Sequence, residues 1–270
     1  FERDLFVEGK THIMISANAV NGVKAGLGSS YLAQIISDYS DEIKKESSMM
    51  SGNTSNYGYE IFPRYLFNPE LNYQTFMIPG LIAMLLILIV GFLPALNIVS
   101  EKEKGTIEQI NVTPVGRFDF IFSKLIPYWC VGLLILTYSI FLGWKIYGLV
   151  PVGNLGLIYL FATLFILVVS CLGLIVSNYS ETTQQASLIM FFFLVIFILM
   201  NGLRTPIAGM PEWAQAITRI NPLRYFIEAM RMLYLKGSSF SDLIFHFLAL
   251  IAYMLVVWGW AIFSYRKTSN

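Results

Sequence analysis

The residues of this sequence that could do chemistry are few, and they form no catalytic pattern. Gly9-Lys10-Thr11 resembles the end of a phosphate-binding P-loop, but that motif needs a glycine where Asp4 stands and a strand before it, not after it. His12 and His246 are too far apart to give a metal-ligand spacing. No Ser/His/Asp, Cys/His or paired-carboxylate arrangement is present either. We therefore expect no enzyme activity, no cofactor, no metal and no bound nucleotide in this chain.

The composition is typical of a membrane protein. The chain is 56% hydrophobic and 13% charged, whereas soluble domains are about 45–50% apolar and about 25% charged. The charged residues are missing from long stretches rather than thinned evenly. Cys130 and Cys171 both lie in such stretches, where they are expected to be small hydrophobic residues rather than a disulfide. A net charge of +1 gives no indication of a nucleic-acid partner.

Five segments are long enough to cross a membrane, because a bilayer core about 30 Å thick requires roughly 20 apolar residues in a helix. They are residues 73–97, 120–147, 155–177, 185–203 and 243–265. Pro79 and Pro94 lie near the two ends of the first segment, where a kink costs least. The sequence thus predicts an all-α polytopic membrane domain over residues 73–270.

The predicted spans lack the charges that ion-driven transport requires. Carriers coupled to ion gradients place carboxylates or basic groups at depth, but here no ionisable group lies in the middle of a span except His246, near the start of the last one. The other polar groups are uncharged: Thr137, Ser139, Ser170 and Asn201. We expect the hydroxyls of Thr137, Ser139 and Ser170 to bond to their own helix backbone. Energy for transport must then come from outside the spans.

Residues 1–72 have a different pattern. His12–Ser16 reads as a strand, and Asn18 is a plausible N-cap for a helix whose apolar positions recur every three to four residues up to Ile43. A polar loop follows, and Tyr57–Phe67 reads as a returning strand. This unit is too small to form a core alone. We interpret it as part of a larger water-exposed α/β domain.

Two segments between spans carry the remaining polar residues. The loop Ser100–Pro114 has carboxylates around a short apolar face, which fits either an interfacial connector or a helix that docks into a partner. Residues 210–236 read as two short helices broken at Asn221-Pro222. This pair is either a re-entrant lid or an amphipathic pair resting on lipid.

The second of these short helices has two distinct faces. Arg224, Glu228 and Arg231 follow one polar stripe, where the arginines pair with Glu228 or meet an anionic headgroup. The opposite face is apolar. Its residues are Leu223, Phe226, Ile227, Met230 and Tyr234.

In these segments the sequence resembles the permease subunits of type-2 ABC exporters, a class with multidrug, polysaccharide and lipid exporters among its members. Matching residues of the cytoplasmic coupling loop are Glu101, Glu103, Gly105, Thr106, Glu108 and Gln109. Those of the external helix pair are Pro211, Trp213, Asn221, Pro222, Arg224, Glu228 and Arg231. Arg64 and Asn68-Pro69-Glu70, leading to Pro79-Gly80, match the entry into the second family span.

This resemblance implies six spans in the complete protein, five of them in this sequence, with a first span missing before residue 1. Residues 1–72 are then outside the cell membrane, while 98–119 and 266–270 are inside, an orientation that the Lys and Arg counts alone leave open. It further implies a permease dimer, formed with a second copy or a paralogue, on ABC ATP-binding subunits that hold ATP and Mg²⁺. We expect a lipid-like or amphipathic drug-like cargo. The alternative function is a non-transporting sensor or scaffold coupled to a cytoplasmic ATPase.

Overall fold

The structure is a computed structural model that describes residues 28–39, 42, 73–106, 116–203 and 207–264. The chain divides into two units, Phe1–Arg64 and Tyr65–Asn270. In the first unit residues 28–39 are helical, inside the long helix expected after Asn18. The predicted strands His12–Ser16 and Tyr57–Phe67 lie outside the described residues. The helical character is confirmed, but the described residues contain no strand and give no support to an α/β domain.

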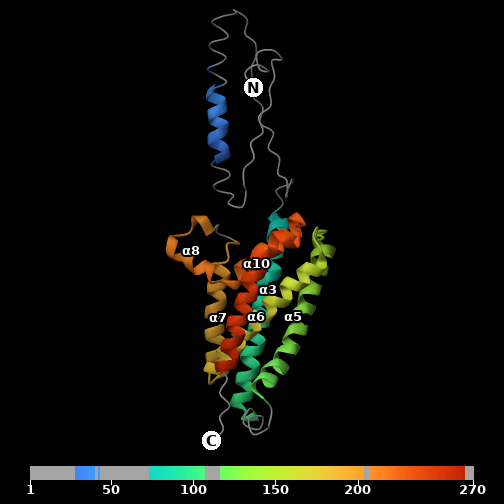
Figure 1. Ribbon diagram of the computed structural model, residues 1–270, viewed down its shortest axis with the longest axis vertical. Helices are drawn as coiled ribbons and strands as arrows, with labels where there is room; N and C mark the ends of the chain where they lie inside the picture. The colour runs from blue at the N-terminus through green and yellow to red at the C-terminus, as the bar shows by residue number, and fades with distance from the viewer. Residues whose placement is uncertain (1–27, 40–41, 43–72, 107–115, 204–206, 265–270) are drawn as a thin grey trace, which may run out of the picture. The chain divides into compact units, whose positions relative to one another are not determined.

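The second unit is a bundle of helices (Figure 1). Its elements are α3 (Tyr73–Glu103), α5 (Arg117–Tyr147), α6 (Leu155–Tyr179), α7 (Thr183–Leu199), η1 (Ile207–Gly209), α8 (Glu212–Arg219), α9 (Pro222–Arg231), η2 (Met232–Lys236) and α10 (Phe240–Ser264). The five longest helices run alongside one another. The short helices α8 and α9 lie at one end of the bundle.

Four helices of this bundle are long and apolar enough to cross a membrane: Gln74–Glu103, Ile121–Tyr147, Leu155–Tyr179 and Phe240–Ser264. The remaining predicted span, residues 185–203, corresponds to α7, which is apolar but has 17 residues. At 1.5 Å per residue it extends about 26 Å, slightly less than the hydrocarbon core of a bilayer. The described residues thus contain four helices of full spanning length, and α7 is a shorter apolar helix beside them.

The centre of the bundle is the contact between α3 and α6. Helix α6 is the most buried of the candidate spans, with 72% of its apolar window inside the protein. Gly173 makes the close approach possible, because a Cβ there would lie 2.5 Å from the Gly91 carbonyl oxygen and 2.6 Å from Pro94 Cγ. Small residues allow membrane helices to pack backbone to backbone in this way. Phe165 of α6 also stacks on Phe226 of α9, with ring centroids 4.3 Å apart.

The outer faces of the bundle are apolar, as expected of a protein whose solvent is lipid. Leu134 on α5 is 69% exposed, Phe192 on α7 is 62% exposed and Val256 on α10 is 68% exposed. A water-soluble protein rarely exposes large apolar side chains on several neighbouring helices in this way. The exposure therefore supports membrane insertion independently of helix length.

Helix α3 continues past its predicted end at residue 97. It reaches Glu103, so that Pro94 lies in the helix interior and the first part of the expected loop is helical. Ile98 and Val99 are buried at 1% and 0% exposure, and this packing extends the helix. Gly105 follows with a positive φ of 72°, the left-handed conformation in which glycine commonly ends a helix.

We predict that Gly173→Ala destabilises the protein by about 1–3 kcal/mol, because the added methyl group collides with the backbone of α3. Gly259→Ala in α10 is the matched control, since a Cβ there meets no atom within 4 Å. Thermal unfolding of the two variants in detergent measures the difference. Equal melting temperatures for both would contradict the close α3–α6 contact.

Candidate functional site

The C-terminal turn of α3 holds the end of α6 through Lys102. The Lys102 ammonium donates hydrogen bonds to the backbone carbonyls of Ser177, Asn178 (3.2 Å) and Ser180 (3.3 Å). The last carbonyls of an α-helix have no partner within the helix and carry partial negative charge. A lysine from a neighbouring helix therefore satisfies the C-terminus of α6 both by hydrogen bonding and by charge.

The next residue, Glu103, holds the beginning of α7. Its carboxylate accepts hydrogen bonds from the Thr183 backbone N–H (2.7 Å) and the Thr183 hydroxyl (2.6 Å). Thr182 accepts a further bond from Gln185 N as the N-cap of the same helix. A carboxylate at a helix N-terminus is stabilised by the unpaired N–H groups and the helix dipole. Two successive residues of α3 thus cap two different helices.

Glu101 completes this turn by pairing with α5. Its carboxylate lies 2.5 Å from the Lys124 ammonium, and its backbone carbonyl accepts a 3.0 Å hydrogen bond from the Thr106 hydroxyl. We call residues 101–106 the α3 terminal turn. Of the predicted coupling residues, it brings together Glu101, Glu103, Gly105 and Thr106. Glu108 and Gln109 lie outside the described residues.

Sequence reasoning missed the inward partners of these glutamates. Lys124 pairs with Glu101, and Thr183 donates to Glu103. Neither residue was singled out in the sequence, and nor was Lys102, which donates to the end of α6. The available signal was the polar run Ser177–Thr183 between two apolar segments, which has the composition of adjoining helix ends. The α3 terminal turn is therefore a junction inside the chain as well as a predicted docking surface.

At the opposite end of the bundle Asn221 joins α9 to α7. Its side-chain oxygen accepts from Leu223 N (3.0 Å) as the N-cap of α9, with Pro222 at the first helical position. The amide nitrogen donates to the carbonyls of Phe197 (2.8 Å) and Met200 (3.1 Å) at the end of α7. One side chain therefore begins one helix and satisfies the end of another.

Of the two arginines in the polar stripe of α9, only Arg224 forms an ion pair with Glu228. Arg224 Nε lies 3.1 Å from Glu228 Oε1, and His246 of α10 contacts Glu228 Oε2 at 3.1 Å. Burial raises the pKa of Glu228, but the hydrogen bonds from His246 and Arg224 outweigh burial and leave this pKa below its usual value. The expected pair between Arg224 and Glu228 is present. His246 is a partner that the sequence did not suggest.

The prediction that Arg231 also pairs with Glu228 is wrong. Its guanidinium lies over the ring of Phe76 on α3, 3.7 Å from the centroid, in a cation–π contact. Its Nε and Nη2 atoms are buried without a hydrogen-bond partner among the described residues. Burial lowers the pKa of Arg231 to about 10, partly offset by the charge of Glu228. Glu228 is already occupied by two other partners, which leaves Arg231 to anchor α9 on α3.

The helix α9 is embedded in the protein and does not rest on lipid. Its predicted apolar face is fully enclosed: Leu223, Phe226, Ile227, Met230 and Tyr234 are each at most 2% exposed. The interpretation of α9 as a lipid-resting helix is therefore wrong. Its neighbour α8 differs, since Trp213 is 64% exposed and Ile220 is 70% exposed. Pro211 immediately precedes α8 as its N-cap residue.

We predict that Lys102→Met destabilises the protein by about 1–3 kcal/mol, because the carbonyls at the end of α6 lose their donor. Lys104→Met, two residues away on an exposed side chain, is the control and should leave stability unchanged. The measurement is thermal unfolding of the detergent-solubilised protein. If both variants unfold like the wild type, Lys102 does not hold α6.

We predict a pH-dependent effect for Glu228→Gln. Because the folded pKa of Glu228 is depressed, its contribution is complete above the usual value of 4.5 and is lost as pH falls through the folded pKa. The variant should be about 1 kcal/mol less stable than wild type at pH 7, and the gap should close below about pH 4.5. Unfolding curves across this range test it, with the exposed Glu212→Gln as control. A gap that stays constant with pH would contradict the ion pair.

Comparison with known proteins adds to this geometry. The profile of the "ABC-2 family transporter protein" family matches residues 1–263. The "Probable multidrug ABC transporter permease YbhR" of Escherichia coli (strain K12) is 30% identical over 239 residues, covering 88% of this chain and 63% of that protein.

Two further relatives come from the same organism. "Probable multidrug ABC transporter permease YbhS" is 30% identical over 72% of this chain and 52% of its own length. "Inner membrane transport permease YhhJ" is 26% identical over 99% of this chain and 71% of its own length. The chain thus spans about half to two thirds of the length of YbhS and YbhR. The family match extends over nearly the whole sequence, and this chain belongs to the ABC-2 family of transporter membrane proteins.

Proposed function

We propose that the chain is the membrane permease subunit of an ATP-driven ABC exporter. The cargo is a lipid-like or amphipathic drug-like molecule that leaves the cytoplasm or the inner membrane, and a separate ABC subunit binds ATP and Mg²⁺. The observation that carries the proposal is the α3 terminal turn, which links a charged inter-span segment to three other helices. The relatives named as multidrug permeases support the same class.

In this proposal α7 is a fifth crossing despite its 17 residues. Its first residue bonds to Glu103 at the C-terminal end of α3. Its last turn is held by Asn221, at the start of α9. The helix α9 in turn reaches the N-terminal end of α3 through Arg231 and Phe76. The two ends of α7 are thus linked to opposite ends of α3, as they must be in a helix that crosses the bilayer.

The α3 terminal turn would couple the partner's motion to the spans. A force applied to the segment after Gly105 reaches α5 through Glu101, α6 through Lys102 and α7 through Glu103. Because each contact is charge-assisted, it is stronger than an ordinary hydrogen bond and is held at a fixed position. The turn would then move all four helices together when ATP binding draws the partner subunits closed.

At the other end of the bundle α9 would receive this motion. It is tied to α7 by Asn221, to α10 by the Glu228–His246 contact and to α3 by Arg231. A shift of these spans must move α9 or break those bonds. We therefore assign α8 and α9 to the external side, as a lid over the exit path between two permease copies in the inner membrane. The N-terminal unit lies outside on the same assignment.

The test is reconstitution of the full-length chain with its ABC subunit in vesicles, measuring ATP turnover and cargo export together. Amphipathic cargo should stimulate turnover. Glu108→Lys should reduce cargo export by about tenfold, the effect of losing about 1.4 kcal/mol at a docking surface, without altering the melting temperature. Glu42→Lys, on an exposed side chain outside the coupling segment and the lid, is the control. A cargo-stimulated ATPase that moves no cargo would favour the sensor or scaffold instead.

A further inference from the structure

The helix η2, which follows α9, is a π-helix and is therefore wound more widely than an α-helix. Its last carbonyls show the difference. The Gly237 N–H donates to the Met232 carbonyl, and the Ser238 N–H donates to the same oxygen (3.2 Å). In an α-helix these two N–H groups would bond to the carbonyls four residues back, those of Leu233 and Tyr234. The π-turn therefore deprives two carbonyls of their α-helical donors.

The loop between α5 and α6 supplies other donors to these two carbonyls. The Gly153 N–H donates to the Leu233 carbonyl at 2.9 Å. The Val152 N–H donates to the Tyr234 carbonyl at 3.2 Å. This approach requires a glycine, because a Cβ at residue 153 would lie 2.6 Å from the Leu233 oxygen. We call Val152 and Gly153 the loop clasp. The two carbonyls thus have two alternative pairs of donors, one in the loop clasp and one at the end of η2.

An exchange between these donors would change η2 from a π-helix to an α-helix and would move α9. The tighter turn rotates the preceding helix about its axis. Such a rotation carries Arg231 away from Phe76 on α3. It also carries Glu228 away from His246 on α10. The loop clasp therefore holds α9 in the one register at which its apolar face is enclosed.

The helix α5 connects the loop clasp to the α3 terminal turn. It is one continuous helix, Arg117–Tyr147, which runs the length of the bundle (Figure 1). It ends at Gly148, in the left-handed conformation with a φ of 65°. Near its other end Lys124 pairs with Glu101 of the α3 terminal turn. Because a helix is a stiff element, a displacement of Lys124 is carried along α5 to the loop clasp.

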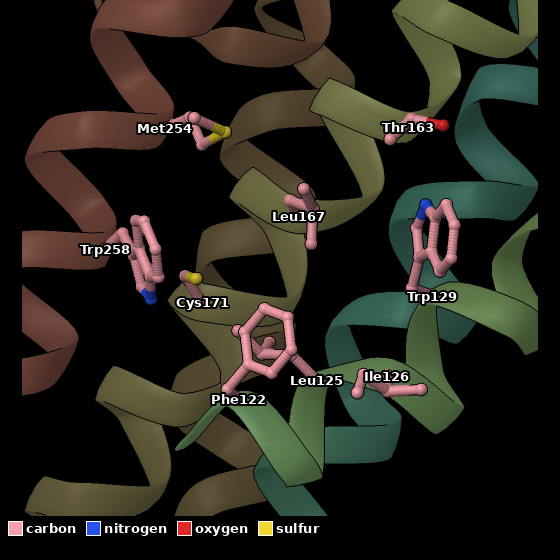
Figure 2. A pocket seen from close by; sticks show the side chains of 9 residues that line it. All are labelled: Phe122, Leu125, Ile126, Trp129, Thr163, Leu167, Cys171, Met254 and Trp258. Atoms are coloured by element: carbon pink, nitrogen blue, oxygen red, sulfur yellow. The ribbon is translucent and has the colours of Figure 1, made fainter. Parts of the chain in front are cut away.

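The packing of α5 leaves it room to move. A pocket of about 450 Å³ lies between α5, α6 and α10. Figure 2 shows Trp129 of α5 on one side of it and Trp258 of α10 on the other, with Leu167 of α6 between them. Side chains that face each other across a pocket do not interdigitate as they do in a close-packed interior. They therefore do not fix this part of α5 against α10.

We propose that the loop clasp is a latch for the external lid formed by α8 and α9. In the closed state it holds η2 as a π-helix. Movement of α5 withdraws the loop clasp, η2 tightens to an α-helix with Gly237 and Ser238 as donors, and α9 turns away from α3 and α10. Each of the two carbonyls has a donor in both states, so a small displacement decides between them. The two forms of η2 follow from its geometry, and their use in export rests on the proposed function.

Thiol labelling from outside measures the position of α9. In a full-length chain that carries no other cysteine, Met230→Cys places one thiol on the buried face of α9. A membrane-impermeant maleimide should label this parent protein slowly. Adding Gly153→Ala, which forces the loop away from the Leu233 carbonyl, should raise the labelling rate by about tenfold, the usual effect of losing two neutral hydrogen bonds. Adding Gly209→Ala instead is the control, since a Cβ there meets no atom within 4 Å. Equal rates for the two variants would overturn the latch.

Hydrogen exchange, measured by mass spectrometry on peptides of each segment, separates the latch from a general loss of stability. In Gly153→Ala the amides of the loop clasp should exchange at least about tenfold faster than in wild type. The amides of Gly237 and Ser238 should keep their protection, because they now bond to the carbonyls that the loop has left. Faster exchange in both segments would show that the substitution only loosens the fold, and it would overturn the exchange of donors.

The response to ATP distinguishes this latch from the proposed function. With the ABC subunit bound, ATP should raise the labelling rate of the Met230→Cys parent to the rate that Gly153→Ala shows without ATP. Labelling that rises with ATP but not with Gly153→Ala would overturn the latch alone. Labelling that rises with Gly153→Ala but never with ATP would overturn the proposed function and leave the latch standing.

Discussion

The structure depends on how the ends of its helices are satisfied at the α3 terminal turn. Helix ends leave N–H and C=O groups without partners inside the helix, and these groups must be satisfied by side chains of other elements or by water. Lys102 and Glu103 satisfy the end of α6 and the start of α7 from a third helix. The charge order Lys–Glu matches the negative C-terminus of α6 and the positive N-terminus of α7. Exchanging the two charges would oppose both helix dipoles.

Side chains also join the helices at the other end of the bundle, here through an amide, a cation–π contact and a Glu–His contact. Asn221 satisfies the end of α7 and begins α9. Arg231 stacks on Phe76, and Glu228 meets His246, so that α9 is fixed to both α3 and α10. Because α9 also packs its whole apolar face inward, it forms part of the bundle core. A change in the relative positions of α3, α7 and α10 must therefore be transmitted to α9.

Much of this arrangement could be predicted from the sequence, because lipid imposes long apolar segments whose positions composition reveals. The short helices of residues 210–236 were also readable, from Pro222 and the 3.6-residue period. Three features were not. The extension of α3 to Glu103 depends on burial of Ile98 and Val99 against other helices, which propensity does not report. The pairing of His246 with Glu228 joins residues 18 apart in different helices.

The third feature is the position of Arg231, where the sequence stripe was correct but the partner was not. The i, i+3 spacing to Glu228 allowed an ion pair, and tertiary contacts decided otherwise, since Glu228 was already taken by Arg224 and His246. The same limit applies to Glu101 and Glu103. Their charge suggested an outside partner, whereas the structure shows inside partners as well, in Lys124 and Thr183. Local patterns locate such residues but do not choose among their contacts.

The most direct test of the account is the amount of cargo exported per ATP hydrolysed by Glu103→Ala, in vesicles that hold the full-length chain and its ABC subunit. If the α3 terminal turn transmits motion, the ABC subunit assembled with this variant should still hydrolyse ATP. The complex should then export markedly less cargo per ATP than the wild-type complex. Lys104→Ala, the exposed neighbour, should match wild type. An unchanged ratio for Glu103→Ala, measured well below its melting temperature, would show that the junction holds the fold and does not couple it to ATP.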